Sequence, residues 1–177
     1  VSSVSADQVV LADPSVSGSV TLSLAGTASG TVLAITAAGT VANRLWIALE
    51  ALPDEHVWGG GEQMSYLCLN GRAFPIWTSE PGVGRDKTTE LTRLMDAQGM
   101  AGGDYWTTNY PQPTVLTTHG LGVHLTSTAY SVLDFTSPAR HVIQVWEAQL
   151  QLEPGAADTP AQLVGRMADR VGRQPRL

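Results

Sequence analysis

Short runs in which apolar and polar residues alternate recur along this chain, and they restrict its fold more than any other feature. Val20, Leu22 and Leu24 alternate with Thr21 and Ser23. Alternation with a period of two puts successive side chains on opposite faces of a strand, and many such short strands are typical of an antiparallel sandwich or barrel. We therefore predict an all-β fold. Comparable short runs occur at residues 32–35, 45–49, 114–118, 122–127, 130–135, 141–147 and 149–152.

Helix signals are clear only near the end of the chain, at residues 158–172. Thr159 is typical of an N-cap, Pro160 suits the first helical position, and Gln162 stands at the capping-box position. A single helix after a β domain is usually a connector or a packing element. One apolar stripe is expected, with charged residues facing away from it: Leu163, Val164, Met167 and Val171 against Arg166, Asp169 and Arg170.

The end of this helix gives the expected domain boundary. Gly172 is a plausible C-cap, and Pro175 forbids continuation. We predict a β domain over residues 1–157, followed by a helix and linker over residues 158–177. The chain starts with Val rather than Met, and both ends look cut, so we expect a piece of a longer protein.

Glycine and proline mark irregular structure in the middle of the chain. Gly59-Gly60-Gly61 predicts a bulge or a close approach of two backbones. Asn70-Gly71 predicts a two-residue hairpin. Residues 88–95 fit either a strand or a short helix, and we favour a strand. Residues 105–113 are predicted to be extended, because residues before proline avoid the helical region.

Composition excludes several classes of function. The formal net charge of −6 argues against a nucleic-acid partner, whose phosphates require a basic face. No apolar run approaches the roughly 18 residues that span a bilayer, so we expect no membrane partner. Cys68 is the single cysteine, so no disulfide can form within the chain, which favours a reducing, cytoplasmic location.

The segment Phe74–Lys87 carries the densest set of functional side chains. Its prolines and glycines leave room for no helix and no long strand. A turn-rich segment that is dense in aromatic and charged groups is a good candidate for a functional loop, with an ordinary exposed connection as the alternative. Its aromatic, polar and charged residues are Trp77, Thr78, Ser79, Glu80, Arg85, Asp86 and Lys87.

Metal-binding, phosphate-binding and nucleophilic motifs are absent from the sequence. No Walker A spacing and no Gly-x-Ser-x-Gly occurs. Cys68 lies in an apolar run before a turn, so packing explains it better than catalysis, which would require a histidine partner in space. The histidines lack the spacing of a zinc-binding helix, so we predict no metal site and interpret them as structural: His56, His119, His124 and His141.

Carboxylates and aromatic rings are concentrated in the middle of the chain. Two carboxylates could act as the acid and nucleophile of a glycosidase, and aromatic faces pack against the C–H face of a sugar. The opposite interpretation, aromatic residues in the core and solvated carboxylates, stays open. The residues concerned are Glu62, Glu80, Asp86, Glu90 and Asp104, with Trp77, Tyr105 and Trp106.

Several of these segments resemble glycoside hydrolase family 31. His56-Val-Trp-Gly-Gly-Gly-Glu62 resembles the Tyr-Gly-Leu-Gly-Glu turn in the N-terminal β-sandwich of that family. Gly61-Glu62-Gln63 and Phe74–Arg85 are similar to segments of its sulfoquinovosidases, bacterial enzymes that release sulfoquinovose from sulfolipid glycosides. Residues 102–105, 110–114 and 172–175 are also similar, so the resemblance runs from about residue 56 to the end.

The resemblance implies an architecture and an activity. It implies the galactose-mutarotase-like antiparallel β-sandwich at the N-terminal side of a (β/α)8 barrel, with one connecting helix. The family's retaining α-glycosidases carry their nucleophile and acid in the barrel, so no catalytic residue is expected in this segment. Phe74–Lys87 is then expected to help wall the active site, with Trp77, Glu80 and Arg85 as substrate-binding residues; Lys87 would also suit an anionic sulfosugar.

Partners and alternatives follow from the same resemblance. The expected partners are a sulfosugar glycoside and the protein's own catalytic barrel; a homo-oligomer is possible. No metal or organic cofactor is expected, because hydrolysis by two carboxylates and water requires neither. Two alternatives stay open: the same domain of an α-glucosidase or α-xylosidase of family 31, and a free-standing carbohydrate-binding module.

Overall fold

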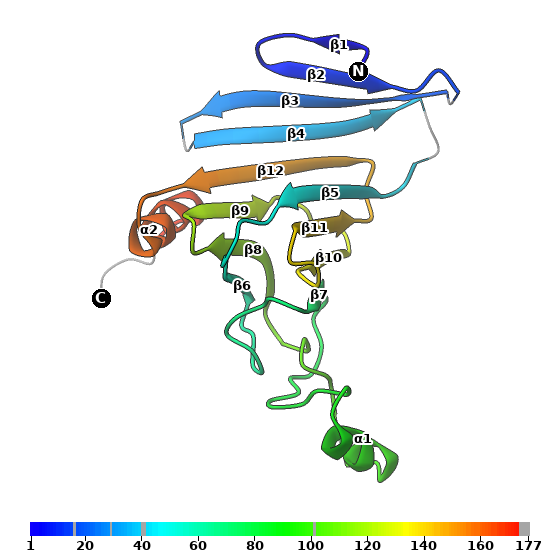
Figure 1. The fold of residues 1–177 in the computed structure, drawn as a ribbon, viewed down its shortest axis with the longest axis vertical. Coiled ribbons are helices and arrows are strands. Elements are labelled where there is room, and N and C mark those ends of the chain that lie inside the picture. Colours follow the sequence, from blue (N-terminus) through cyan, green and yellow to red (C-terminus); the bar gives the residue numbers. More distant parts are fainter. Residues whose placement is uncertain (16, 29, 40–41, 101, 174–177) are drawn as a thin grey trace. The chain divides into compact units, whose positions relative to one another are not determined.

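The chain divides into two compact units. The computed structural model describes residues 1–15, 17–28, 30–39, 42–100 and 102–173. The first unit comprises Val1–Trp46, Leu116–Ala129 and Val145–Leu177, and the second comprises Ile47–Val115 and Tyr130–Gln144. Both consist mainly of antiparallel strands, and the described residues form two helices (Figure 1). The predicted all-β class is therefore confirmed; the predicted division into residues 1–157 and 158–177 stays a prediction.

An antiparallel sheet and helix α2 make up the first unit. Its strands lie in the order β1-β2-β3-β4-β12-β9. The register of β3, β4 and β12 follows the expected alternation of side chains. Leu22 of β3 and Leu150 of β12 both lie opposite Ile35 of β4, so these apolar side chains share one face of the sheet. The bounds are β1 Ser3–Val4, β2 Gln8–Ala12, β3 Ser19–Thr27, β4 Gly30–Ala38, β9 Leu121–Leu125, β12 Gln149–Ala156 and α2 Pro160–Val171.

Helix α2 forms as the sequence predicts and packs on two strands of its own unit. The Thr159 hydroxyl accepts a hydrogen bond from the Gln162 N–H, which caps the helix. Buried Leu163 and Met167 lie over Gly122 of β9 and Gly155 of β12. A methyl group at Gly122 would come within 3.1 Å of Leu163 Cδ1, so the missing side chains leave room for the helix.

Two parts of the α2 prediction differ from the structure. Val164 is exposed, so the buried stripe is narrower than expected. Arg170, expected to face away, has a largely buried side chain, with its Nη1 3.9 Å from Glu153 Oε2. The side chain of Val171 and residues 174–177, with Pro175, lie outside the described residues.

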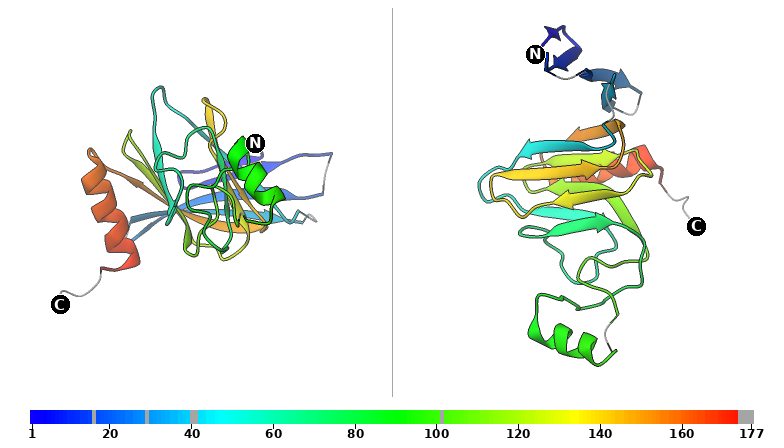
Figure 2. Two further views of the ribbon diagram at one scale, coloured as in Figure 1. Left: turned by 90° about the horizontal axis from the view of Figure 1, so that it is seen from below. Right: turned by 90° about the vertical axis from the view of Figure 1, so that its right-hand side faces the viewer.

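The second unit contains a four-stranded sheet, a second strand pair and helix α1. The sheet has the order β5-β11-β10-β7, and β8 lies beside β6 (Figure 2). Leu133 of β10 is paired with Phe74 of β7, and both side chains are fully buried. Strands β5, β8 and β11 extend by one or two residues into the first unit. The bounds are β5 Leu45–Glu50, β6 Val57–Gly61, β7 Ala73–Ile76, α1 Glu90–Ala97, β8 Pro111–Thr117, β10 Ser131–Asp134 and β11 Arg140–Val145.

The glycine run in β6 marks a close approach of backbones, as the sequence predicts. Gly59, Gly60 and Gly61 all have positive φ, between 74° and 116°. A side chain at Gly61 would collide with the Tyr110 carbonyl oxygen, and one at Gly59 would collide with the Thr114 carbonyl oxygen. Only glycine fits at these positions. Other L residues rarely adopt a positive φ, and the neighbouring backbone leaves no space for a Cβ atom.

Three local predictions in this unit are wrong in whole or in part. Residues 90–97 form helix α1 instead of a strand, because the Thr89 hydroxyl caps the helix by accepting from the Thr92 N–H and Glu90 lies in the first turn. Asn70-Gly71 forms a turn without a hairpin, because residues 62–69 form no strand and β7 pairs with β10. Residues 105–110 are mostly turns and bends, with one isolated bridge at Thr108, so the predicted extended segment forms a strand only from Pro111, in β8.

The described residues lack two features that would indicate a membrane or metal-binding function. No helix in this part of the chain is long and apolar enough to cross a membrane. Among the same residues, no group of three or more His, Cys, Asp or Glu side chains is placed to hold a metal ion.

Candidate functional site

The predicted functional loop follows strand β7 directly. The first residues of Phe74–Lys87 belong to β7, whereas residues 77–89 have no regular helix or strand and lead into helix α1. We call residues 77–89 the site loop. Near its start, Thr78 forms an isolated parallel bridge with Thr108, and the Ser79 N–H donates to the Thr108 carbonyl at 2.9 Å. These two contacts anchor the start of the loop to Thr108, which is buried.

A buried carboxylate organises the second half of the site loop. Asp86 is 7% exposed and accepts hydrogen bonds from the Tyr66 hydroxyl at 2.6 Å, the Thr88 N–H at 2.9 Å and the Thr88 hydroxyl. The bonds to Thr88 form a local turn in which an aspartate bonds the backbone two residues on. The bond to Tyr66 reaches across 20 positions of sequence. Asp86 thus ties the loop to itself and to the 62–69 segment.

These contacts also set the charge states around Asp86. Hydrogen bonds from Thr88, then from Tyr66, hold the pKa of the Asp86 carboxyl below its usual range. The same carboxylate raises the pKa of the Tyr66 phenol, which therefore stays protonated and donates at neutral pH. The Arg72 guanidinium lies over the Tyr66 ring, 3.5 Å from its centroid. Asp86 is ionised at neutral pH and engaged with protein donors.

Asp104 supports the loop from a second side. Its Oδ1 accepts from the Lys87 N–H at 2.9 Å and from the Tyr105 N–H at 2.8 Å. Tyr105 in turn donates its hydroxyl to the Ala73 carbonyl at 2.6 Å and packs edge-on against Phe74. The carboxylates that the sequence grouped as candidate acids are therefore not equivalent, since Asp86 and Asp104 hold the backbone of the loop.

The three predicted substrate-binding residues have different surroundings. Trp77 is 58% exposed, and its ring meets Tyr130 in an edge contact with a centroid distance of 5.8 Å. Glu80 is exposed. Arg85 is half-buried, and its Nη1 donates to Met95 Sδ of α1 at 2.8 Å. The structure gathers the three in one loop, but among the described residues no hydrogen bond, ion pair or ring contact joins any two of them.

Sequence reasoning missed two features of this region. It did not single out Tyr66, which carries no local signal because its partner lies 20 residues away. It also did not place His56 beside Cys68: Nδ1 and Sγ lie 3.6 Å apart, while the thiol donates to Asn70 Oδ1 at 3.1 Å. Cys68 is half-buried, consistent with the packing role expected for it.

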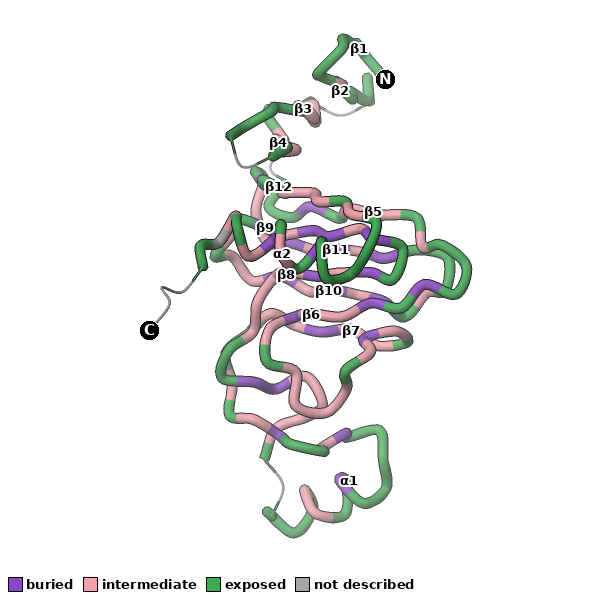
Figure 3. Tube along the Cα trace, turned by 90° about the vertical axis from the view of Figure 1, so that its left-hand side faces the viewer, coloured by how far each residue is buried: buried purple, intermediate pink, exposed green. Residues whose placement is uncertain are grey.

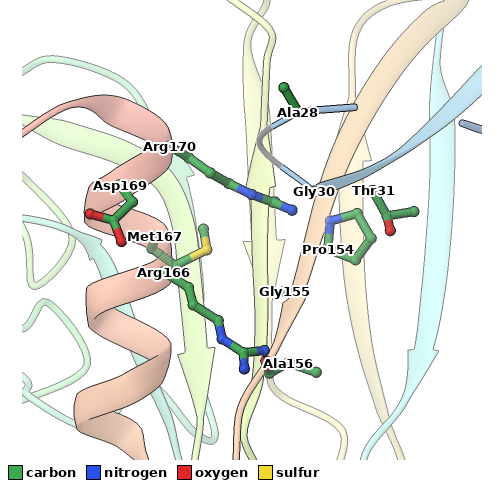
Figure 4. A pocket seen from close by; sticks show the side chains of 10 residues that line it. All are labelled: Ala28, Gly30, Thr31, Pro154, Gly155, Ala156, Arg166, Met167, Asp169 and Arg170. Carbon is green, nitrogen blue, oxygen red and sulfur yellow. Dashed lines mark hydrogen bonds between the residues drawn. The ribbon is translucent and has the colours of Figure 1, made fainter. Parts of the chain in front are cut away.

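A hollow in the first unit is separate from all these residues. It measures about 610 Å³ and lies between helix α2 and strands β4 and β12 (Figure 4). Arg166, which lines it, donates to the Ala156 carbonyl, and Arg170 points toward Gly30. Both guanidinium groups thus meet the protein's own atoms, and none of the predicted site residues lines the hollow.

Comparison with known proteins identifies the segment. No family model matches the chain. It is 50% identical to a sulfoquinovosidase of Agrobacterium fabrum over 85% of its own length, and 43% identical to a sulfoquinovosidase of Escherichia coli over 76%. The chain is homologous to one segment of the sulfoquinovosidases. It spans only 23% and 20% of the length of these two curated relatives.

Solved structures agree with this homology. A GH31 family sulfoquinovosidase from E. rectale, solved with the aza-sugar inhibitor IFGSQ, superposes with a TM-score of 0.75 at 41% identity. It matches 98% of this chain and 26% of that one. A cycloalternan-forming enzyme from Listeria monocytogenes matches 98% of the chain with a TM-score of 0.59 but at 12% identity, which shows the fold alone. The resemblance predicted from the motifs between residue 56 and the end of the chain is confirmed, and so is the antiparallel β fold expected from it: the chain has the fold of the N-terminal part of family 31 glycoside hydrolases.

Proposed function

We propose that the full-length protein is a retaining α-glycosidase that hydrolyses α-sulfoquinovosides, and that this chain is its non-catalytic N-terminal segment. The observation that carries the proposal is the 50% identity to the A. fabrum sulfoquinovosidase over 85% of the chain. Neighbours at 12–18% identity support no particular substrate. The nucleophile and the acid/base are then expected in the catalytic barrel of the same polypeptide. The cytoplasmic location expected from the single cysteine stays a prediction.

Within this enzyme the site loop would wall the active site. The exposed indole of Trp77 offers an apolar face to the C–H face of a sugar ring. A guanidinium donates charge-assisted hydrogen bonds, so Arg85 would suit the sulfonate of the substrate. The exposed carboxylate of Glu80 would accept hydrogen bonds from sugar hydroxyls. Asp86 and Asp104 support this role because they hold the loop backbone while Trp77 and Glu80 remain exposed.

The test compares substrates in the full-length enzyme. Arg85→Ala should lower kcat/KM on a chromogenic α-sulfoquinovoside by about tenfold or more, because a hydrogen bond to a charged group contributes about 1.5–3 kcal/mol. Activity on the matching α-glucoside, which lacks the sulfonate, should change little. Glu80→Ala should weaken hydrolysis of both glycosides, because hydroxyl groups are common to them.

Arg93→Ala provides a matched control, since Arg93 is an exposed arginine of the same unit that lies outside the site loop. Its kinetics should equal those of the natural enzyme. Unchanged kcat/KM on the sulfoquinovoside in both Arg85→Ala and Glu80→Ala would refute the substrate-wall role and leave these residues as structural.

A further inference from the structure

Helix α1 is attached to the site loop through three consecutive loop residues. Their partners on the helix occupy positions 92, 95 and 96, which share one helical face because side chains three and four apart are neighbours. The position of the Arg85 guanidinium therefore depends on where α1 lies. The pairs are Arg85 Nη1 with Met95 Sδ at 2.8 Å, Asp86 N–H with Thr92 Oγ1 at 3.2 Å, and Lys87 Nζ with Asp96 Oδ2 at 2.9 Å.

The burial of α1 is the reverse of that of an ordinary surface helix. Thr92 is only 4% exposed, whereas Leu91 and Leu94 are 68% and 55% exposed. Most of the α1 tube has the colours of exposed and intermediate residues (Figure 3). These leucines are three residues apart and share a face that the loop does not cover. Met100, just after the helix, is also exposed. Surface helices normally turn leucines inward, so an inner face of Thr92, Met95 and Asp96 with both leucines on the outer face indicates a second surface that covers the leucines.

The size of related proteins indicates what covers them. The chain corresponds to 23% of the A. fabrum sulfoquinovosidase and 26% of the E. rectale structure, so about three quarters of each lies outside the matched segment. A surface on the same polypeptide meets α1 at a far higher effective concentration than another molecule does. We propose that Leu91 and Leu94 pack against the part of the full-length protein outside this chain, and that this contact fixes the site loop. The effect on the loop rests on the proposed function; the packing contact does not.

The packing contact is tested by labelling the full-length protein. Leu91, Leu94 and Arg93 are each replaced by cysteine, and maleimide labelling is followed by mass spectrometry on the peptide that carries the new thiol. Arg93 is the matched control because it is an exposed residue between the two leucines. The thiols at 91 and 94 should label about tenfold or more slowly than the thiol at 93, since a covered thiol is inaccessible to the reagent. Equal rates at the three positions would overturn the proposal.

Dilution separates the same polypeptide from a second copy. Protection within one polypeptide is independent of protein concentration, whereas protection by a second molecule is lost on dilution. Slow labelling at 91 and 94 that persists over a hundredfold dilution supports the proposal. Protection that disappears on dilution would assign the leucine face to a contact between copies and overturn the proposal.

The effect on the loop is tested by kinetics and hydrogen exchange. Leu91→Gln combined with Leu94→Gln keeps good helix-forming residues but removes the apolar face. It should lower kcat/KM on the α-sulfoquinovoside several-fold and speed amide exchange in residues 77–100, whereas Arg93→Gln should do neither. Leu91→Met with Leu94→Met should restore both, because methionine keeps the apolar volume.

The outcomes distinguish the two proposals. Normal kinetics in the double glutamine variant would overturn the link between packing and loop. Slow labelling at 91 and 94, together with normal kinetics in Arg85→Ala and Glu80→Ala, would refute the substrate wall and leave the packing contact standing. Equal labelling at 91, 93 and 94 would refute the packing contact whatever the kinetics of Arg85→Ala.

Discussion

The interior of the second unit and its site loop are stabilised in opposite ways. The interior rests on fully buried apolar side chains, among them Leu69, Phe74 and Leu133, each of which loses water on all sides. The site loop depends on two carboxylates: Asp86 accepts hydrogen bonds from Tyr66 and Thr88, and Asp104 accepts one from the Lys87 N–H. Apolar burial spreads stability over the whole unit, whereas polar contacts concentrate it locally. Changes in the interior should therefore unfold the unit, and changes in the loop should alter only its order.

Phe74→Ala should have the largest effect. Phe74 is fully buried and packs edge-on against Tyr105, so its loss should reduce the free energy of unfolding by about 3–5 kcal/mol. Urea unfolding followed by far-UV circular dichroism measures this. Trp77→Ala, three residues on and 58% exposed, should cost less than about 1 kcal/mol. If Phe74→Ala disordered the site loop but left the free energy of global unfolding unchanged, the distinction between interior and loop would be wrong.

A second test uses the polar pair inside the apolar interior. His141 Nε2 and Glu55 Oε2 lie 2.8 Å apart, with side chains 6% and 3% exposed. His141→Leu removes the imidazole from the buried carboxyl and should cost about 3 kcal/mol. In a double-mutant cycle with Glu55→Leu, the double variant should be less destabilised than the sum of the single variants. Strict additivity would show that the two groups are energetically independent.

Asp86→Asn should act locally and with a smaller magnitude. The amide is a weaker acceptor than the carboxylate, so residues 77–89 should open more easily by about 1–2 kcal/mol while global unfolding changes little. Amide hydrogen exchange of the loop peptides measures the opening, and exchange in β10 is the internal control. Accelerated exchange throughout the unit would contradict a local role.

Acid should act on the same contact. The folded pKa of Asp86 lies below its usual value, so its contribution is fully present above the unfolded pKa, near 3.9, and is lost as pH falls through the folded pKa. Loop protection should stay constant between about pH 8 and 5 and decline below about pH 4. The Asp86→Asn variant should lack the part of this decline that Asp86 causes.

Lys87→Ala should have the smallest effect. Lys87 Nζ lies 2.9 Å from Asp96 Oδ2, and this exposed pair raises the pKa of the lysine. Water and salt screen such a pair, so no resolvable change in the unfolding midpoint is expected. The loop peptides should exchange slightly faster at low ionic strength and equally at 0.5 M salt. A midpoint shift as large as that of Phe74→Ala would place the surface pair among the main stabilising contacts.

The parts that the sequence predicted are those with local signals. Alternation identified β3, β4, β5 and the strands from β8 to β12, because the period of a strand is written in consecutive residues. The cap and first turn of α2 were predicted in the same way, since Thr159, Pro160 and Gln162 are adjacent. Homology to a segment of the sulfoquinovosidases was predicted from motifs spread from His56 to the end of the chain, among them the long motif Phe74–Arg85.

The parts that it did not predict depend on distant contacts. Helix α1 was missed because Thr88, Thr89 and Thr92 favour a strand by propensity, while its contacts with the site loop come from the folded chain. Asn70 takes part in no hairpin. Its side chain instead accepts a hydrogen bond from the Val57 N–H and donates one to the Glu55 carbonyl. The location of Trp77, Glu80 and Arg85 in one loop was predictable, whereas the partners of Arg85 and Asp86 were not.

The three contacts between the site loop and α1 have a consequence for engineering this protein. Arg85, Asp86 and Lys87 take partners from Met95, Thr92 and Asp96, so the loop and the helix form one transplantable block. A chimaera that exchanges residues 77–87 alone with a homologue would pair a foreign loop with a native helix. Exchange of residues 77–100 keeps each guanidinium, amide and ammonium with its own acceptor, so the transferred loop should keep the contacts that fix its conformation.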